Sequence, residues 1–229
     1  MNALVNDELD VLASLVPIDG KAIIELGCGA AKLARTLLHR HPDSQVTGLE
    51  VDARQHAKNL ASPQPGLHFV AGGAQAIPFP DASFDVALML KSLHHVPLPL
   101  LAQALGEVAR VLRPHGCLYV SEPVYRGPLN EVIRLFNDEG VVRAAAQAAM
   151  DAATRSGAWE QAAERFFEMP VSFRDFADFE TRMMRPTFAD HRIDDAKLAE
   201  VGTAFAPHMT SDGAHFTRPM HVRVLRKHT

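Results

Sequence analysis

The chain has 229 residues, of which 47% are hydrophobic and 22% are charged, as in an ordinary globular protein. Its formal net charge of -4 gives no reason to expect a nucleic-acid partner. No apolar run approaches the roughly 18 residues that span a bilayer, so we expect no membrane partner either. The acidic N-terminal residues do not resemble a signal peptide, and the chain has only two cysteines, Cys28 and Cys117. Both features favour a cytoplasmic location.

The first 60 residues predict a helix followed by alternating strands and helices. Leucines at helical spacing predict a lead-in helix over residues 6–16. The apolar run at residues 22–26 has the length and bulk of a buried parallel strand, and a helix with leucines at helical spacing follows it. A second strand is expected over residues 45–50, where Asp52 is placed to cap the next helix.

The middle of the chain continues this alternation. Short apolar runs predict strands over residues 67–70, 84–90 and 117–121. A helix with leucine and valine on one face is expected between the last two, over residues 99–112. Strands that alternate with helices at this spacing predict a mostly parallel sheet with helices on both faces.

After residue 123 the pattern changes. Residues 128–184 show no strand alternation, and alanine becomes frequent. We therefore expect residues 124–185 to form a helical lid or insertion after the fifth strand, within a single domain that covers residues 1–229.

The end of the chain returns to the earlier pattern. We expect extended structure at residues 186–188 and a helix over residues 196–205. Alternating apolar residues predict a last strand over residues 216–225.

The turn Gly27-Cys28-Gly29 joins the first predicted strand to its helix. Such a turn is either a plain strand–helix connection or a ligand site, because it leaves unpaired amides at a helix N-terminus. Glu25 favours the ligand site. A carboxylate in a buried strand is costly unless a cationic group pairs with it.

Glu50 follows Gly29 by 21 positions (50 minus 29), which suits an acid that binds a ribose diol. The same spacing would also suit a nicotinamide-dependent oxidoreductase. The dinucleotide fingerprint, however, needs a third small residue where this chain has Lys32. Glu25 would also lie close to the phosphates of a dinucleotide. Both residues favour a cationic ligand without phosphate.

Five segments follow one another in order between residues 21 and 123. They are Glu25–Gly29, Val46–Asp52, Ile77–Val86, Leu93–Val96 and Val111–Leu118. Together they resemble the class I S-adenosylmethionine-dependent methyltransferases, in a subgroup that acts on small molecules. The resemblance implies a Rossmann-like, seven-stranded, mostly parallel sheet with helices on both faces and a helical insertion after the fifth strand.

The resemblance also implies S-adenosyl-L-methionine as cofactor and S-adenosyl-L-homocysteine as product. The residues implied to bind this cofactor are Glu25, Gly27, Cys28, Gly29, Glu50, Val51, Gly73, Ala74, Gln75, Leu90 and Lys91. One position departs from the family, which commonly has an acidic residue where this chain has Gly73. Gln75 or a backbone carbonyl is the candidate replacement, because an amide oxygen also accepts a hydrogen bond. The alternative is a simple variable loop.

His94 and His95 follow the fourth predicted strand and are the candidate catalytic residues. One of them would act as a general base if the acceptor must lose a proton; the alternative is a histidine that only holds the loop. Tyr125, Arg126 and His191 are candidates to line the acceptor pocket. Each of these three has an ordinary surface or capping role as its alternative.

The predicted insertion is rich in large aromatic residues. They are Phe136, Trp159, Phe166, Phe167 and Phe173. They form either the core of a lid or the wall of a pocket for an apolar or aromatic small molecule. No metal site is expected, because the chain has neither an H-E-x-x-H motif nor a Cys-x-x-Cys pair.

The sequence therefore predicts a methyltransferase that acts on oxygen, nitrogen or carbon of a small, apolar or aromatic acceptor. The alternative is a non-catalytic protein of the same fold that binds S-adenosylmethionine or S-adenosylhomocysteine. A homodimer is compatible with the sequence and is left open.

Overall fold

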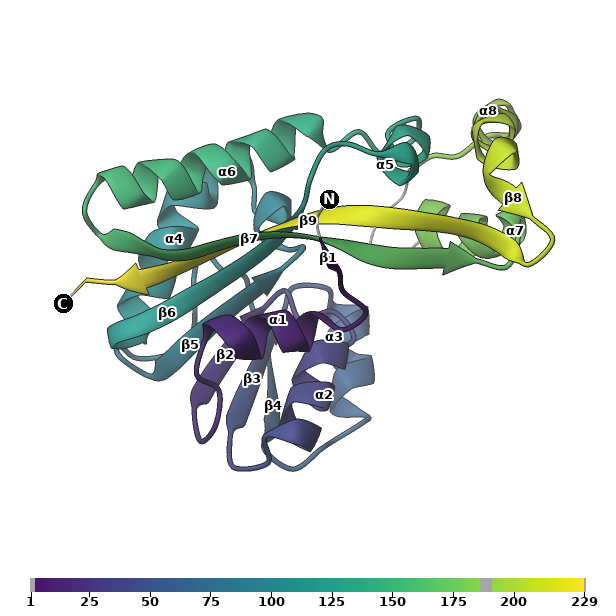
Figure 1. Ribbon diagram of the computed structural model, residues 1–229. Coiled ribbons are helices and arrows are strands. Elements are labelled where there is room, and N and C mark those ends of the chain that lie inside the picture. Colours follow the sequence, from purple (N-terminus) through teal and green to yellow (C-terminus); the bar gives the residue numbers. More distant parts are fainter. Residues whose placement is uncertain (1–2, 186–190, 229) are drawn as a thin grey trace. The chain divides into compact units, whose positions relative to one another are not determined.

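The computed structural model describes residues 3–185 and 191–228 (Figure 1). Contacts divide the chain into two compact units. The first, here called the sheet unit, comprises residues 7–122, 144–165 and 221–229. The second, here called the aromatic unit, comprises residues 1–6, 123–143 and 166–220. None of the described helices is both long enough and apolar enough to cross a membrane.

The elements follow one another along the chain with the labels of Figure 1. The strands are β1 Ala3–Leu4, β2 Ala22–Leu26, β3 Gln45–Glu50, β4 Leu67–Ala71, β5 Phe84–Leu90, β6 Leu112–Pro123, β7 Trp159–Phe173, β8 Met209–Thr210 and β9 Gly213–Lys227. The helices are α1 Glu8–Leu15, α2 Lys32–Arg40, α3 Ala53–Leu60, α4 Leu101–Val111, α5 Pro128–Ile133, α6 Gly140–Arg155, α7 Phe176–Phe179 and α8 Asp195–Phe205. Short turns of helix are η1 Leu93–His95, η2 Leu98–Leu100, η3 Glu180–Met184 and η4 Ala206–His208.

The sheet unit is built on strands in the order β7-β9-β6-β5-β2-β3-β4. The neighbours β2 and β3, β3 and β4, β2 and β5, and β5 and β6 all pair in parallel. Figure 1 shows that β9 runs antiparallel to β6 and β7. β1 pairs with β7 and β8 with β9, so the described residues form nine strands where seven were predicted, and the predicted mostly parallel sheet is confirmed. The strand order reverses between β2 and β5, and ligands of such sheets bind at the carboxyl ends beside that reversal.

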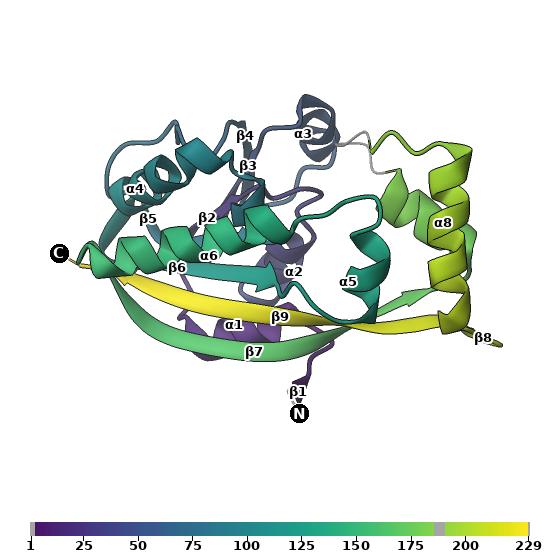
Figure 2. The ribbon, with the colours of Figure 1, turned by 90° about the horizontal axis from the view of Figure 1, so that it is seen from above.

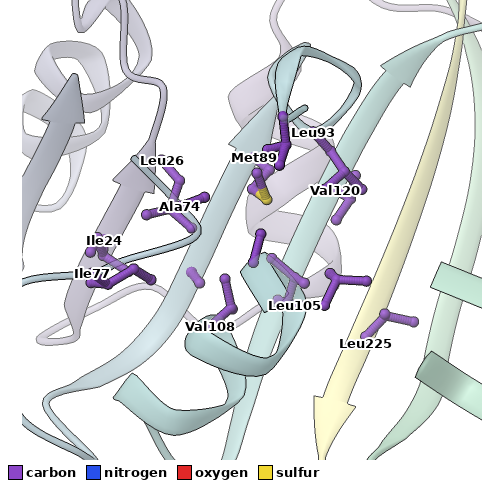
Figure 3. Packing of buried hydrophobic residues seen from close by; sticks show 14 of the residues in the cluster. Ile24, Leu26, Ala74, Ile77, Met89, Leu93, Leu105, Val108, Val120 and Leu225 are labelled. Atoms are coloured by element: carbon purple, nitrogen blue, oxygen red, sulfur yellow. The ribbon is translucent and has the colours of Figure 1, made fainter. Parts of the chain in front are cut away.

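One face of this sheet packs on α4 and α6. Alternate residues of β2, β5 and β6 point into a cluster that is completely or almost completely buried. Figure 3 labels ten members of the cluster: Ile24, Leu26, Ala74, Ile77, Met89, Leu93, Leu105, Val108, Val120 and Leu225. Residues at the intervening strand positions face α1 and α2, because successive side chains of a strand alternate between faces. Glu25 lies on this second face.

The predicted elements before residue 123 are confirmed with small shifts of their ends, except that the strand predicted over residues 117–121 already begins at Leu112. The strands over residues 22–26, 45–50 and 84–90 have the predicted bounds. Asp52 caps α3 as predicted, because its side chain accepts a hydrogen bond from the backbone N–H of Arg54 at 3.0 Å.

The prediction that residues 128–184 contain no strand is wrong. The 15-residue strand β7, Trp159–Phe173, crosses this segment between α6 and α7. Between the buried Trp159 and Phe167 none of its residues is buried, so the strand alternation is hidden in the sequence. The strand forms because β9 and β1 pair with it, and such pairing overrides local propensity.

The aromatic unit has a core of its own, in which α5 and α8 pack on parts of β7 and β9 (Figure 2). Phe173, Phe179 and Phe205 are buried, and their ring centroids lie 4.9 to 6.1 Å apart. The predicted helix over residues 196–205 and the last predicted strand are confirmed as α8 and β9. The extended structure expected at residues 186–188 lies outside the described residues.

Gly48 in β3 provides a test of the packing beneath the glycine turn. A Cβ at Gly48 would come within 2.8 Å of the Cys28 Sγ and 3.1 Å of the Phe69 ring. We expect Gly48→Ala to lower the free energy of unfolding by about 2 kcal/mol, as overpacking does in well-packed cores. In the Cys28→Ala background the loss should be smaller, as measured by urea denaturation, because the sulfur is gone. Equal losses in both backgrounds would contradict this account.

Candidate functional site

The glycine turn between β2 and α2 lies where the strand order reverses. Gly27 and Gly29 have φ of +73° and +52°, a region that favours glycine. A Cβ at Gly27 would lie 2.8 Å from the Cβ of Ser92, which follows β5. A Cβ at Gly29 would meet nothing within 4 Å. Gly27 is therefore needed for close packing, whereas Gly29 leaves open space beside the backbone.

Two residues of α3 hold this turn in place. The Asn59 side chain donates a hydrogen bond to the Gly29 carbonyl at 2.7 Å, and Gln55 donates to Asn59 at 2.9 Å. Asn59 is 3% exposed. Sequence reasoning missed it, because a lone asparagine in a helix resembles any other surface residue before the fold is known.

Cys28 supports the turn by packing. Its thiol is buried, and this burial raises the pKa of Cys28 to about 12. The negative charges of the nearby Glu25 and Glu50 add to the effect. A thiol with such a pKa stays protonated at neutral pH and is a poor nucleophile. Its predicted place beside the cofactor is therefore one of shape, not of covalent chemistry.

Glu50 closes the end of β3 with both carboxylate oxygens. One oxygen accepts from the Gly29 N–H at 2.8 Å, and the other accepts from the Asp52 N–H at 2.9 Å. The side chain is buried, with 7% of the residue exposed. Each carboxylate oxygen has a second lone pair, so Glu50 can also accept from two ligand hydroxyls. The backbone thus orients an acceptor pair that suits a ribose diol.

Glu25 is the most costly residue of the site. It is 4% exposed, and its Oε2 atom has no hydrogen-bond partner among the described residues. Burial raises the pKa of Glu25 to about 8, against the opposing effects of Lys91 and of the backbone N–H of Ala34. A positive ligand group beside Oε2 would favour the charged carboxylate.

The end of β4 lies next to Glu50, since the Gly72 N–H donates to the Glu50 carbonyl at 3.1 Å. A Cβ at Gly73 would come within 2.5 Å of the Gln75 Oε1 atom. The Gln75 carboxamide therefore occupies the space that a side chain at position 73 would take. This geometry favours Gln75 over a purely variable loop as the replacement for the missing acid.

The other cofactor candidates differ in exposure. Ala74 is buried in the core cluster, and Leu90 is partly buried at the end of β5. Val51 is 72% exposed beside Glu50, so its side chain is available to a flat ligand group. Lys91 follows Leu90 and forms an ion pair with Glu8 of α1.

His94 is buried in the short helix η1, and its Nδ1 atom pairs with Glu122 at the end of β6. The other oxygen of Glu122 accepts from the Leu93 N–H at 2.9 Å. With an ionised Glu122 as acceptor, the Nδ1 atom would donate the hydrogen bond, which would leave Nε2 as the basic atom of a neutral ring. His95 is exposed, and its ring centroid lies 4.0 Å from that of His94. Sequence reasoning missed Glu122, although an acid at the end of the neighbouring strand is a usable signal.

The acceptor candidates lie in the aromatic unit, apart in sequence from the donor candidates. Tyr125 donates to Asp138 at 2.8 Å, next to the start of α6. Arg126 is exposed, and the His191 ring lies 5.6 Å from the Phe136 ring. Their part in binding an acceptor stays a prediction.

The aromatic residues expected to share one lid or pocket wall divide between environments. Trp159 belongs to the core of the sheet unit, and Phe173 to the core of the aromatic unit. Phe167 is 1% exposed, whereas Phe166 is 45% exposed. Phe136 packs against the core of the aromatic unit, so four of the five are buried in or packed against hydrophobic cores, although Trp159 belongs to the core of the sheet unit and not to that of a lid.

Residues 24–120 match a family model described as a methyltransferase domain. The chain is 40% identical over 129 residues to phthiotriol/phenolphthiotriol dimycocerosates methyltransferase 1 of Mycobacterium ulcerans, covering 52% of this chain and 43% of that protein. It is 39% identical over 111 residues to a fatty-acid O-methyltransferase of Mycolicibacterium smegmatis, covering 45% and 38%. This chain thus spans about two fifths of the length of these curated relatives.

Solved structures share the fold over nearly the whole chain. The YcgJ protein from Bacillus subtilis has a TM-score of 0.67 at 16% identity, over 97% of this chain and 98% of that one. The [4+2]-cyclase SpnF has a TM-score of 0.62 at 19% identity, over 100% of this chain and 86% of that one. Identities this low show the fold alone.

The pKa of Glu25 leads to a stability prediction with a definite sign. The unfolded chain ionises Glu25 near pH 4.5 but the folded chain near pH 8, so burial costs stability as the pH rises between these values. We expect Glu25→Gln to raise the free energy of unfolding by about 3 kcal/mol at pH 8 and by less than about 1 kcal/mol at pH 5. Denaturant unfolding across this range measures it, with the exposed Glu160→Gln as control. A gain that does not depend on pH would contradict the assignment.

Proposed function

Because residues 24–120 match a methyltransferase domain, we propose that this chain is a class I S-adenosylmethionine-dependent methyltransferase that transfers the methyl group of S-adenosyl-L-methionine to a small, apolar acceptor. One observation carries the proposal. The open turn at Gly29 is flanked by two buried carboxylates, and Glu25 has an oxygen without a partner among the described residues. This is a site for a cationic ligand that has hydroxyl groups and no phosphate.

The donor set fits the parts of this cofactor. Glu25 would face the α-ammonium group, since its unpartnered Oε2 atom offers an acceptor. Glu50 would accept from the ribose hydroxyls, and Gly29 would let the ligand approach the backbone. Val51 and Gln75 would lie beside the adenine ring. When bound, the sulfonium ion supplies an activated methyl group.

The role of the protein would be to hold the acceptor atom in line with the methyl group and to remove a proton where the acceptor has one to lose. His94 suits the second task. Glu122 fixes its ring and stabilises the imidazolium ion that forms when Nε2 takes up a proton. The alternative is that this pair only holds η1, and it predicts that replacing the histidine does not change the rate.

We propose an oxygen atom of an apolar, lipid-like molecule as the acceptor. The matched relatives are named for methylation of phthiotriol or phenolphthiotriol dimycocerosates and of fatty acids, and a further one, from Penicillium expansum, is an O-methyltransferase 34% identical over 134 residues. A histidine base with a carboxylate partner suits a hydroxyl acceptor better than a carbon acceptor.

A second candidate is a protein that binds the cofactor without methyl transfer. The fold match to the [4+2]-cyclase SpnF supports this second candidate, since one fold can host different chemistries. Release of S-adenosylhomocysteine from S-adenosylmethionine with an alcohol, phenol or fatty acid acceptor distinguishes the two candidates. Binding without release in a broad acceptor screen would favour the second.

Binding of S-adenosylhomocysteine tests the donor site directly. We expect Glu50→Ala to weaken binding about 100-fold in calorimetry, because two charge-assisted hydrogen bonds to the ligand are lost. Asp43→Ala changes an exposed acid in the preceding loop and is the matched control. If the wild type shows no binding at millimolar ligand, the proposed function is wrong.

His94 gives the test of the general base. With a hydroxyl acceptor, His94→Gln should lower the turnover rate by about 100-fold or more and leave the affinity for S-adenosylhomocysteine within about twofold. His39→Gln, which changes an exposed histidine of α2, serves as control. Unchanged turnover in His94→Gln would assign the histidine to loop structure.

A further inference from the structure

A cluster of charges lies on the α1 side of the sheet, at the ends of β2 and β5. Glu8 in the first turn of α1 is 5% exposed, yet it carries a carboxylate. Its Oε2 atom pairs with the Lys91 Nζ atom at 2.8 Å, and its Oε1 atom has no hydrogen-bond partner among the described residues. Burying such a pair is expensive, so the cluster calls for an explanation beyond stability.

Glu25 lies close to this pair, whose Glu8 belongs to the helix that covers the Glu25 face of the sheet. Glu25 lies opposite Leu88 in the parallel β2–β5 pairing, and residues in register share a face. Lys91 comes three residues after Leu88, and its side chain reaches Glu8 on α1, the helix that covers this face. Consistent with their proximity, Lys91 lowers and Glu8 raises the pKa of Glu25.

The backbone fixes where Lys91 begins. Its φ of +56° is in the left-handed region, which is uncommon for residues other than glycine. Its N–H donates to the Ser121 carbonyl of β6 at 2.7 Å. The next residue, Ser92, packs against Gly27 and donates to the Leu26 carbonyl at 2.7 Å. Lys91 is thus anchored beside the glycine turn, with a side chain that is 35% exposed and accessible to a ligand.

We propose that Lys91, held by Glu8, binds the carboxylate of the cofactor's amino-acid end while the unpartnered oxygen of Glu25 binds its ammonium group. The two residues then bind both charged groups of the zwitterion: Glu25 binds the positive group and Lys91 binds the negative one. Glu8 is a positioning residue, which keeps the ammonium group of Lys91 away from Glu25. This inference rests on the proposed function, because it needs an S-adenosyl amino acid as ligand.

Two ligands that differ by the carboxylate alone test the assignment. S-adenosylhomocysteine carries both charged groups, and its decarboxylated analogue keeps only the amine. For the wild type, we expect the first to bind more tightly by about 10- to 100-fold in calorimetry, as a hydrogen-bonded ion pair allows. Lys91→Met should lose this preference, to within about twofold, by weakening S-adenosylhomocysteine alone. Lys91→Arg should retain most of it.

Glu8→Gln has a different expected signature. Without its partner, Lys91 is free to pair with Glu25, so affinity should fall about tenfold for both ligands, the decarboxylated one included. Lys58→Met removes an exposed lysine of α3 and is the matched control. Circular dichroism and thermal unfolding of each variant confirm that the fold is intact.

The outcomes separate the two proposals. If the wild type binds S-adenosylhomocysteine and Lys91→Met weakens both ligands equally, or neither, the role of Lys91 is wrong and the proposed function stands. If Glu8→Gln leaves both affinities unchanged, the positioning role of Glu8 is wrong. If the wild type binds neither ligand at millimolar concentration, the proposed function fails and this inference fails with it.

Discussion

The contact between Gly27 and Ser92 is the constraint on which the site depends. The sheet reverses its strand order between β2 and β5, and the chain leaves both strands at the same edge. The two segments approach so closely that no Cβ fits at Gly27, and the Ser92 hydroxyl bonds to the Leu26 carbonyl. Because this contact fixes both strand ends, the charged residues beside it come from two strands and still hold definite positions.

Glu25 and Glu50 show two ways of placing a carboxylate at such an edge. Glu50 is satisfied by two backbone N–H groups, so it is oriented before any ligand arrives. Glu25 is buried with one oxygen unpartnered among the described residues, and its raised pKa reflects that cost. The Glu50 arrangement orients the carboxylate for the ligand. The Glu25 arrangement carries a free-energy cost of burial, which a bound cationic group would offset. A site with both gains affinity and selectivity from the same two strands.

The sequence was sufficient for the elements whose signals are local. Apolar runs located β2, β3 and β5, and the Asp52 cap located the start of α3. β7 was missed because its buried residues Trp159, Phe167 and Phe173 are separated by exposed or half-buried ones, and its pairing partners lie far away in the chain. A strand that depends on distant partners has no periodic signature to read.

The same distinction explains which site residues could be found. Glu25, Glu50 and the glycines lie within or beside strands that the apolar pattern identifies, so their spacing carries information. Glu122, Asn59 and Glu8 act through contacts that span from 28 to 83 positions along the chain. Nothing in their immediate neighbours marks them, and only the fold brings them to the glycine turn or to the strand ends beside it.

The donor and acceptor halves of the proposed reaction follow from different parts of the chain. The match to the methyltransferase family covers residues 24–120, which hold the glycine turn and both carboxylates. The predicted acceptor residues belong to the aromatic unit, whose phenylalanines pack mainly on one another. A core of this kind tolerates exchange of apolar residues of similar volume, so its sequence is free to vary without loss of the fold. The cofactor can therefore be predicted from the sequence of the strands, whereas the acceptor must be identified by experiment on the aromatic unit.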